Sequence, residues 1–62
     1  MAVLSIYKKA RMRCFLSQSD AAELLGISRS YLSVIENLSV NPTQELVIKM
    51  ARLYEVNPKE LV

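Results

Sequence analysis

The stretch that decides the fold is LSQSDAAELLGISRSYLSVIEN, residues 16–37. It contains two helical patterns, because apolar side chains recur at spacings of three and four on both sides of Gly26. Ser17 and Ser28 each precede one of these patterns and are typical N-cap residues. Gly26 ends the first pattern, since glycine adopts the left-handed backbone conformation without penalty. The stretch therefore predicts two short helices joined by a tight turn, the second running from Arg29 to Glu36.

Both of these helices carry apolar residues that we expect to face a core, and Ala22 has to be small because the second helix crosses close to it. The expected inward residues are Ala21, Ala22, Leu24 and Leu25 in the first helix and Tyr31, Leu32 and Ile35 in the second. The outward residues of the second helix are Arg29, Ser30, Ser33 and Val34. This pattern predicts a helix that is anchored on one side and free to contact a partner on the other.

The flanking sequence continues the helical periodicity without any strand-like alternation. We expect a helix from about Ser5 to Arg13, another from near Thr43 to about Tyr54, and a last short helix capped by Asn57. The side chains expected inside are Tyr7, Ala10, Arg11 and Cys14 in the first of these helices and Val47, Met50, Ala51 and Tyr54 in the next. The predicted fold class is all-α, a single domain over residues 1–62 built as a compact five-helix bundle with its helix-turn-helix at about 17–37.

The composition fits one small domain and excludes several classes of function. Hydrophobic residues make up 52% of the 62 residues, above the roughly 45–50% of an average soluble domain, so we expect apolar surface for a partner or a second copy. Histidine is absent and Cys14 is the only cysteine, which leaves no disulfide, no zinc cluster and no nucleophile–base pair. We therefore predict that the protein is not an enzyme and has no metal and no cofactor.

The net charge of +2 is unevenly distributed along the chain. Residues 1–15 hold four basic and no acidic side chains, whereas residues 16–62 hold four basic and six acidic ones. A one-sided basic patch is compatible with phosphate binding, although Lys8, Lys9 and Arg13 also fit an ordinary solvated helix face. No apolar run approaches the roughly 18 residues of a membrane span, and the first residues do not form a secretion signal, so we expect a cytoplasmic protein.

Residues 16–37 resemble the helix-turn-helix of the Cro and phage-repressor family. They follow its pattern L-S-Q-x-x-x-A-x-x-x-G-[IV]-S-x-x-x-[IL]-S-x-[IL]-E-N without a gap. The positions that make the match specific are Gln18, Ala22, Gly26, Ile27, Leu32 and Glu36. Residues 42–61 resemble the C-terminal pattern of the family as well. The resemblance implies a lambda-repressor-like fold and a sequence-specific transcriptional regulator, a repressor of phage or mobile-element type that binds a double-stranded DNA operator as a homodimer.

The resemblance also implies roles for individual residues. The base-reading positions in the major groove are matched by Ser28, Arg29, Ser30, Ser33 and Val34. Arg29 is the strongest candidate, because a guanidinium can donate two hydrogen bonds to guanine O6 and N7. Val34 either contacts a thymine methyl group or is unused. The candidate phosphate contacts are Ser17, Gln18, Tyr31, Asn37 and Ser39, although the simplest interpretation of Tyr31 is a core or rim residue. Arg11 and Glu36 match a structural ion pair, the alternative for Arg11 being a phosphate contact.

The sequence departs from the family pattern in two places. After Glu-Asn the family usually has a glycine and then a basic residue, whereas this chain has Leu38 and no basic residue at 37–42. We therefore expect Leu38 and Val40 to be exposed and available to a protein partner. The shifted apolar pattern after Thr43 predicts either a rotated packing face or exposure of Leu46 and Leu53 for dimerisation. The rival interpretation of the chain is a protein-interaction module, antitoxin-like or a co-regulator, that uses the same fold.

Overall fold

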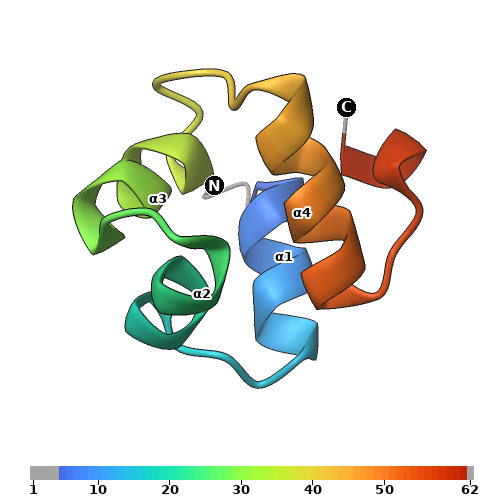
Figure 1. Ribbon diagram of the computed structural model, residues 1–62, viewed down its shortest axis with the longest axis horizontal. Coiled ribbons are helices and arrows are strands. Elements are labelled where there is room, and N and C mark those ends of the chain that lie inside the picture. Colours follow the sequence, from blue (N-terminus) through green and yellow to red (C-terminus); the bar gives the residue numbers. More distant parts are fainter. Residues whose placement is uncertain (1–4, 62) are drawn as a thin grey trace, which may run out of the picture.

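Four α-helices and one 3-10 helix make up the part of the chain that the computed structural model describes, residues 5–61 (Figure 1). The elements are α1 (Ile6–Arg13), α2 (Gln18–Leu25), α3 (Arg29–Glu36), α4 (Gln44–Tyr54) and the 3-10 helix η1 (Pro58–Leu61). Residues 5–61 contain no strand, so the all-α class is confirmed. The fifth helix is a 3-10 helix and not an α-helix. It has only four residues and begins with proline, and its hydrogen bond joins Glu60 N–H to the carbonyl of Asn57, three residues earlier, at 2.8 Å.

Each α-helix begins at a side-chain hydroxyl that caps it. The caps are Ser5, Ser17, Ser28 and Thr43, which have extended backbones and accept hydrogen bonds of 3.0–3.2 Å from the backbone N–H three residues on. Such a cap stabilises a helix by about 1 kcal/mol. The starting points of α2 and α3 are therefore encoded locally, and the sequence predicts both of them correctly.

The turn between α2 and α3 depends on Gly26. Its φ of +73° is left-handed, and its N–H donates to the carbonyl of Glu23 at 3.2 Å. The next N–H, of Ile27, donates to the carbonyl of Ala22 at 3.0 Å, which closes the end of α2. The chain then enters α3 after a single further residue, Ser28, so α3 crosses α2 at close range.

The core lies where α1, α2, α3 and α4 meet, and its centre is formed by Leu32, Ile35 and Met50, none of which is exposed. Ala21 and Ala22 are also buried, and their small side chains let α3 approach α2 closely. Leu61 anchors η1 with 1% of its surface exposed. In Figure 1, α1 and α4 lie between α3 on one side and η1 on the other. This arrangement holds the inner face of α3 and leaves its outer face uncovered.

Two side chains differ from the expectation for their surroundings, and two others decide between the alternatives for α4. Leu24 and Tyr31 were expected inside but are 64% and 36% exposed, because each lies roughly 100° around its helix from the neighbouring buried leucine, at the edge of the packing face. Leu46 is buried and Leu53 is half-buried against the core. Exposure of Leu46 and Leu53 is therefore wrong, and the rotated packing face is the correct alternative for α4.

Candidate functional site

The outer face of α3 and the first residue of α2 share one hollow. It has a volume of about 470 Å³ and is lined by Gln18, Arg29, Ser30, Ser33 and Val34. Arg29 and Ser30 are exposed and Ser33 is half-buried, so their polar groups are accessible from solvent. Arg29 is the single charged residue of this lining. The hollow is therefore shallow, offers accessible polar groups beside an apolar surface, and carries its positive charge at one end of α3.

A buried ion pair fixes the other end of α3. Arg11 of α1 donates from Nε to Glu36 Oε2 at 2.7 Å and from a terminal nitrogen to Glu36 Oε1 at 3.1 Å. The remaining terminal nitrogen of Arg11 donates to the carbonyl of Leu16 at 2.7 Å. The guanidinium thus joins α1, the segment before α2 and the last residue of α3. Because paired planar groups allow little rotation, α3 is held in one orientation.

Gln18 links this ion pair to the hollow. Its Nε2 donates to Glu36 Oε1 at 3.0 Å, while the residue also lines the hollow beside Arg29. The bond between Gln18 and Glu36 was not predictable from the sequence, since the two positions lie 18 residues apart and no local pattern connects them. The bond fixes the start of α2 relative to the end of α3.

The remaining candidate residues lie outside the hollow. Ser17 and Ser28 are exposed, and each uses its hydroxyl oxygen as an N-cap, which leaves the hydroxyl hydrogen free to donate. Tyr31, Asn37 and Ser39 are exposed as well. The structure therefore brings Arg29, Ser30, Ser33, Val34 and Gln18 together and leaves the other candidates at its rim or beyond.

The loop after α3 uses its first backbone N–H groups within the chain. Asn37 N–H donates to Ser33 O at 2.9 Å, Leu38 N–H to Ile35 O at 3.0 Å and Ser39 N–H to Val34 O at 3.0 Å. Leu38 has a left-handed φ of +62°, as this way of ending a helix requires. These three N–H groups are therefore not free to bind a phosphate, and the side chains of the loop are the groups that could do so.

Tyr54 places a hydroxyl next to the ion pair without giving it a partner. Among residues 5–61, its Oη is the buried side-chain oxygen or nitrogen that has no hydrogen bond. Burial, assisted by the negative charge of Glu36 and opposed by Arg11, raises the pKa of Tyr54 to about 12. The sequence predicted that Tyr54 is buried but carried no signal for this unpaired group.

Residues 5–61 contain neither a metal site nor a membrane-spanning helix. No group of histidine, cysteine or carboxylate side chains in this range could hold a metal ion. No helix in the same range has the length and apolar character to cross a membrane.

Comparison with known proteins assigns a family to the chain. The model of the helix-turn-helix family matches residues 8–61, which include all five elements except the first two residues of α1. No curated protein and no solved structure matches the chain. The family is one of DNA-binding, non-enzymatic domains found in regulators of the Cro and phage-repressor type.

Proposed function

This chain belongs to the helix-turn-helix family, and on that premise we propose that it is a sequence-specific transcriptional repressor that inserts α3 into the major groove of DNA. The observation that carries the proposal is the asymmetry of α3. Its inner face is buried through Leu32, Ile35 and Glu36, while its outer face lines an open hollow with accessible polar and charged side chains. A helix anchored in this way fits a groove about 12 Å wide without moving the rest of the domain.

Arg29 is proposed as the main base-reading residue. It is exposed in the first turn of α3, the part of the helix that reaches the base edges. Its guanidinium can donate two hydrogen bonds to guanine O6 and N7, worth about 1–3 kcal/mol of discrimination against another base. Ser28, Ser30 and Ser33 add hydroxyl donors and acceptors along the same side, and Val34 offers an apolar surface for a thymine methyl group.

Phosphate contacts are proposed for Gln18 and for the candidate residues that lie outside the hollow. Gln18 is the first residue of α2, and the N-terminus of a helix attracts anions. Ser17 and Tyr31 add hydroxyl groups, and Asn37 and Ser39 add side-chain donors from the loop. These contacts fix the domain on the duplex and carry no base information themselves.

The chain is proposed to act as a homodimer on a pseudo-palindromic operator. Its longest dimension is 29 Å, which is shorter than the roughly 34 Å between half-sites one helical turn apart. Two copies therefore fit side by side on one face of the duplex, each placing its α3 in one half-site.

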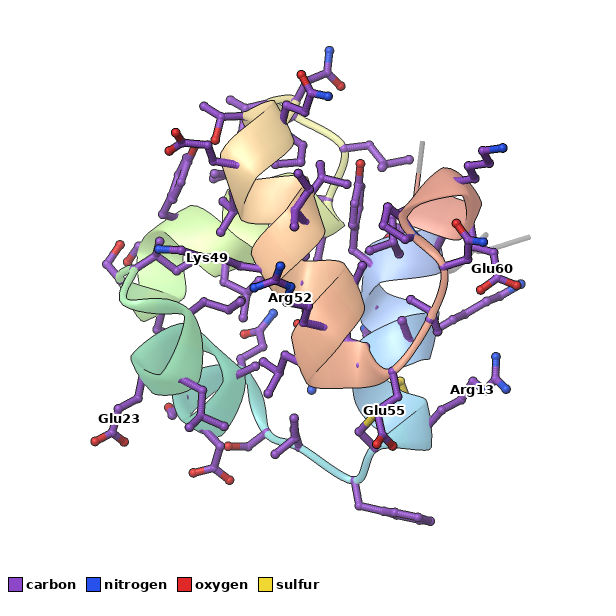
Figure 2. All side chains as sticks on the ribbon, turned by 45° about the vertical axis from the view of Figure 1, so that its right-hand side comes forward. Arg13, Glu23, Lys49, Arg52, Glu55 and Glu60 are labelled. Carbon is purple, nitrogen blue, oxygen red and sulfur yellow. The ribbon has the colours of Figure 1, made fainter. Side chains whose placement is uncertain are left out.

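Selection from random duplexes tests this function. The wild-type chain should enrich a pseudo-palindrome, and Arg29→Ala should lose at least about tenfold in affinity for it, the equivalent of roughly 1.4 kcal/mol. The matched control is Arg52→Ala, which removes the same charge from the exposed side of α4 (Figure 2). Equal losses in both variants, or no enriched sequence at all, would refute base reading by Arg29.

A protein-interaction module is the second candidate function. It is favoured by Leu38 and Val40, which leave 65% and 41% of their surface exposed in a loop without a basic residue. A salt titration of duplex binding separates the two candidates. DNA binding predicts that log K falls with log salt by about 0.9 for each phosphate neutralised. An interaction module instead predicts no affinity for any duplex.

A further inference from the structure

Val34 is an apolar side chain on the otherwise polar outer face of α3. It leaves 37% of its surface exposed and lines the hollow together with Arg29, Ser30 and Ser33. A single exposed valine is common on a protein surface and needs no explanation by itself. On the face proposed to enter the major groove, however, the chemistry of the base edges limits what this valine can contact.

The two serines of the hollow lie between Arg29 and Val34 around the helix. Successive residues of an α-helix are about 100° apart, so Ser33 and Ser30 follow Arg29 at about 40° and 100° and Val34 follows at about 140°. Serine side chains are short, so the middle of the outer face is low, and the hollow of about 470 Å³ lies there. A base edge can therefore approach with the guanidinium on one side and the valine on the other.

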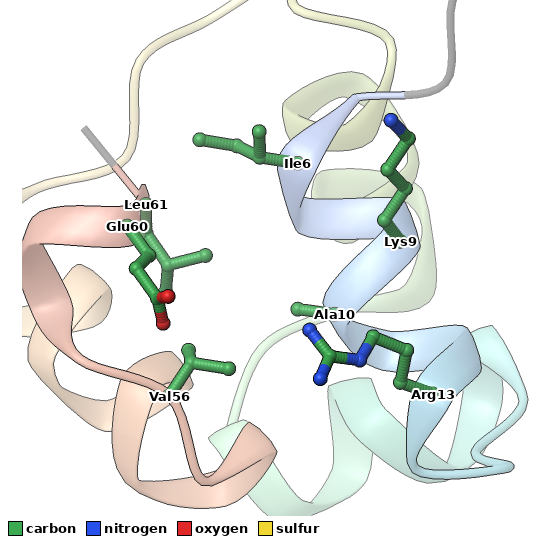
Figure 3. Close-up of a pocket in the computed structure, with 7 residues that line it drawn as sticks. All are labelled: Ile6, Lys9, Ala10, Arg13, Val56, Glu60 and Leu61. Carbon is green, nitrogen blue, oxygen red and sulfur yellow. The ribbon is translucent and has the colours of Figure 1, made fainter.

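The charge of this hollow is unbalanced, unlike that of a groove between α1 and η1. In that groove Arg13 and Glu60 are directed toward each other's wall from opposite sides (Figure 3). In the hollow on α3, Arg29 is the single charged residue, and the ion pair within residues 5–61 is the one between Arg11 and Glu36. The guanidinium of Arg29 is therefore not held by a carboxylate and can bind a guanine while Val34 contacts a nearby base.

The major groove offers an apolar side chain one kind of partner on the base edges. Thymine carries a methyl group at C5, whereas adenine, guanine and unmodified cytosine present hydrogen-bonding groups and no methyl group. Cytosine gains the same C5-methyl group when it is methylated, and it keeps its N4 amino group. The hydroxyl groups of Ser30 and Ser33 both donate and accept, so they tolerate O4 of thymine and the N4 amino group of cytosine alike. The methyl group is therefore the feature that Val34 can detect on either pyrimidine.

We propose that the outer face of α3 reads the C5-methyl group of a pyrimidine, so that methylation of a cytosine at the position facing Val34 strengthens binding. The inference rests on the proposed function, since it assumes that α3 enters the major groove. The pyrimidine lies within about three base pairs of the guanine bound by Arg29, because five residues of helix span about 7.5 Å and base pairs are about 3.4 Å apart. Covering one methyl group is worth about fourfold in affinity.

Two matched changes of the duplex enriched from random sequences test this proposal. Each thymine is replaced in turn by uracil, which removes only the methyl group, and each cytosine by 5-methylcytosine, which adds only the methyl group. We expect one pyrimidine in each half-site to respond, by about fourfold per methyl group, and always in the direction of tighter binding to the methylated base. When a responsive thymine–adenine pair is exchanged for cytosine–guanine, the pair with 5-methylcytosine should bind about fourfold more tightly than the pair with cytosine.

Val34→Ser should abolish both methyl effects, whereas methylation of guanine N7 should still block binding, because Arg29 is unchanged. Ile48→Ser is the matched control, since Ile48 is 39% exposed on α4 and lies outside the hollow. This variant should keep both methyl effects, and circular dichroism should show that both variants are folded.

Three results would overturn the methyl reading and leave the proposed function intact. They are equal affinity for methylated and unmethylated pyrimidines at every position, methyl effects that persist in Val34→Ser, and a preference for thymine over uracil without one for 5-methylcytosine over cytosine. A chain that binds no duplex would instead refute the proposed function, and the methyl reading with it.

Discussion

Removing the guanidinium of Arg11 should cost this protein most of its stability. Arg11 is 8% exposed and donates three hydrogen bonds of 2.7–3.1 Å, two of them to Glu36 and one to the carbonyl of Leu16. In Arg11→Ala the Glu36 carboxylate remains buried, with the amide of Gln18 at 3.0 Å as its remaining side-chain partner. Leaving one member of a buried ion pair unpaired costs about 3–5 kcal/mol.

That loss is large for a chain of this size. At roughly 0.05–0.15 kcal/mol per residue, 62 residues give a free energy of unfolding of about 3–9 kcal/mol. Arg11→Ala should therefore lower the melting temperature by at least about 12 °C or leave the chain largely unfolded. Urea and thermal unfolding followed by circular dichroism measure the change.

Two further variants separate the ion pair from the helix that carries Arg11. Lys9→Ala removes an exposed cation from the same helix and should change stability by less than about 0.5 kcal/mol. Arg11→Met combined with Glu36→Gln removes both charges and should be more stable than Arg11→Ala, because no buried carboxylate is left unpaired. If Arg11→Ala melts within a few degrees of Lys9→Ala, the stabilising role of the ion pair is refuted.

Three further variants test local features by unfolding measurements. Leu38→Gly should raise the free energy of unfolding by up to about 1 kcal/mol, because a φ of +62° is strained for leucine. An unchanged or lower free energy of unfolding would contradict the claim that the backbone of Leu38 is strained. Gly26→Ala should lower the free energy of unfolding by about 1 kcal/mol, because a φ of +73° is strained for alanine. No steric clash adds to this cost, since an added Cβ meets no atom within 4 Å. Tyr54→Phe should raise the free energy of unfolding by about 1 kcal/mol, because the buried hydroxyl has no partner. The folded pKa of Tyr54 lies above its unfolded value of 10.0, so the contribution of this group to stability is fully present below pH 10 and is lost as the pH rises toward 12. In Tyr54→Phe the loss of stability between pH 10 and 12 should be smaller than in the wild type. An equal loss in both chains would contradict the raised pKa of Tyr54.

The helix boundaries were predictable because the sequence encodes them locally. Ser17, Ser28 and Gly26 each act within three or four residues of their position, and their hydrogen bonds are those of a cap or a helix end. Residue type and spacing were therefore sufficient for the turn and for α3. The all-α class followed from the same local signals.

The orientation of residues at the edge of a helix face was not predictable to the same degree. Leu24 and Tyr31 fit an apolar stripe by spacing alone, yet the packing of α2 on α3 and α4 leaves them partly outside. Their exposure depends on how the helices cross, which no local pattern encodes. The bond between Gln18 and Glu36 and the unpaired hydroxyl of Tyr54 are tertiary features for the same reason.

Methylation interference tests the central claim, that the outer face of α3 reads bases in the major groove. The duplex enriched by the wild-type chain would be methylated at guanine N7, which lies in the major groove, and at adenine N3, which lies in the minor groove. We predict that N7 methylation of a guanine in each half-site blocks binding, that N3 methylation does not, and that Arg29→Ala no longer responds to the N7 mark. Interference confined to adenine N3, or N7 interference that is unchanged in Arg29→Ala, would contradict this account of α3.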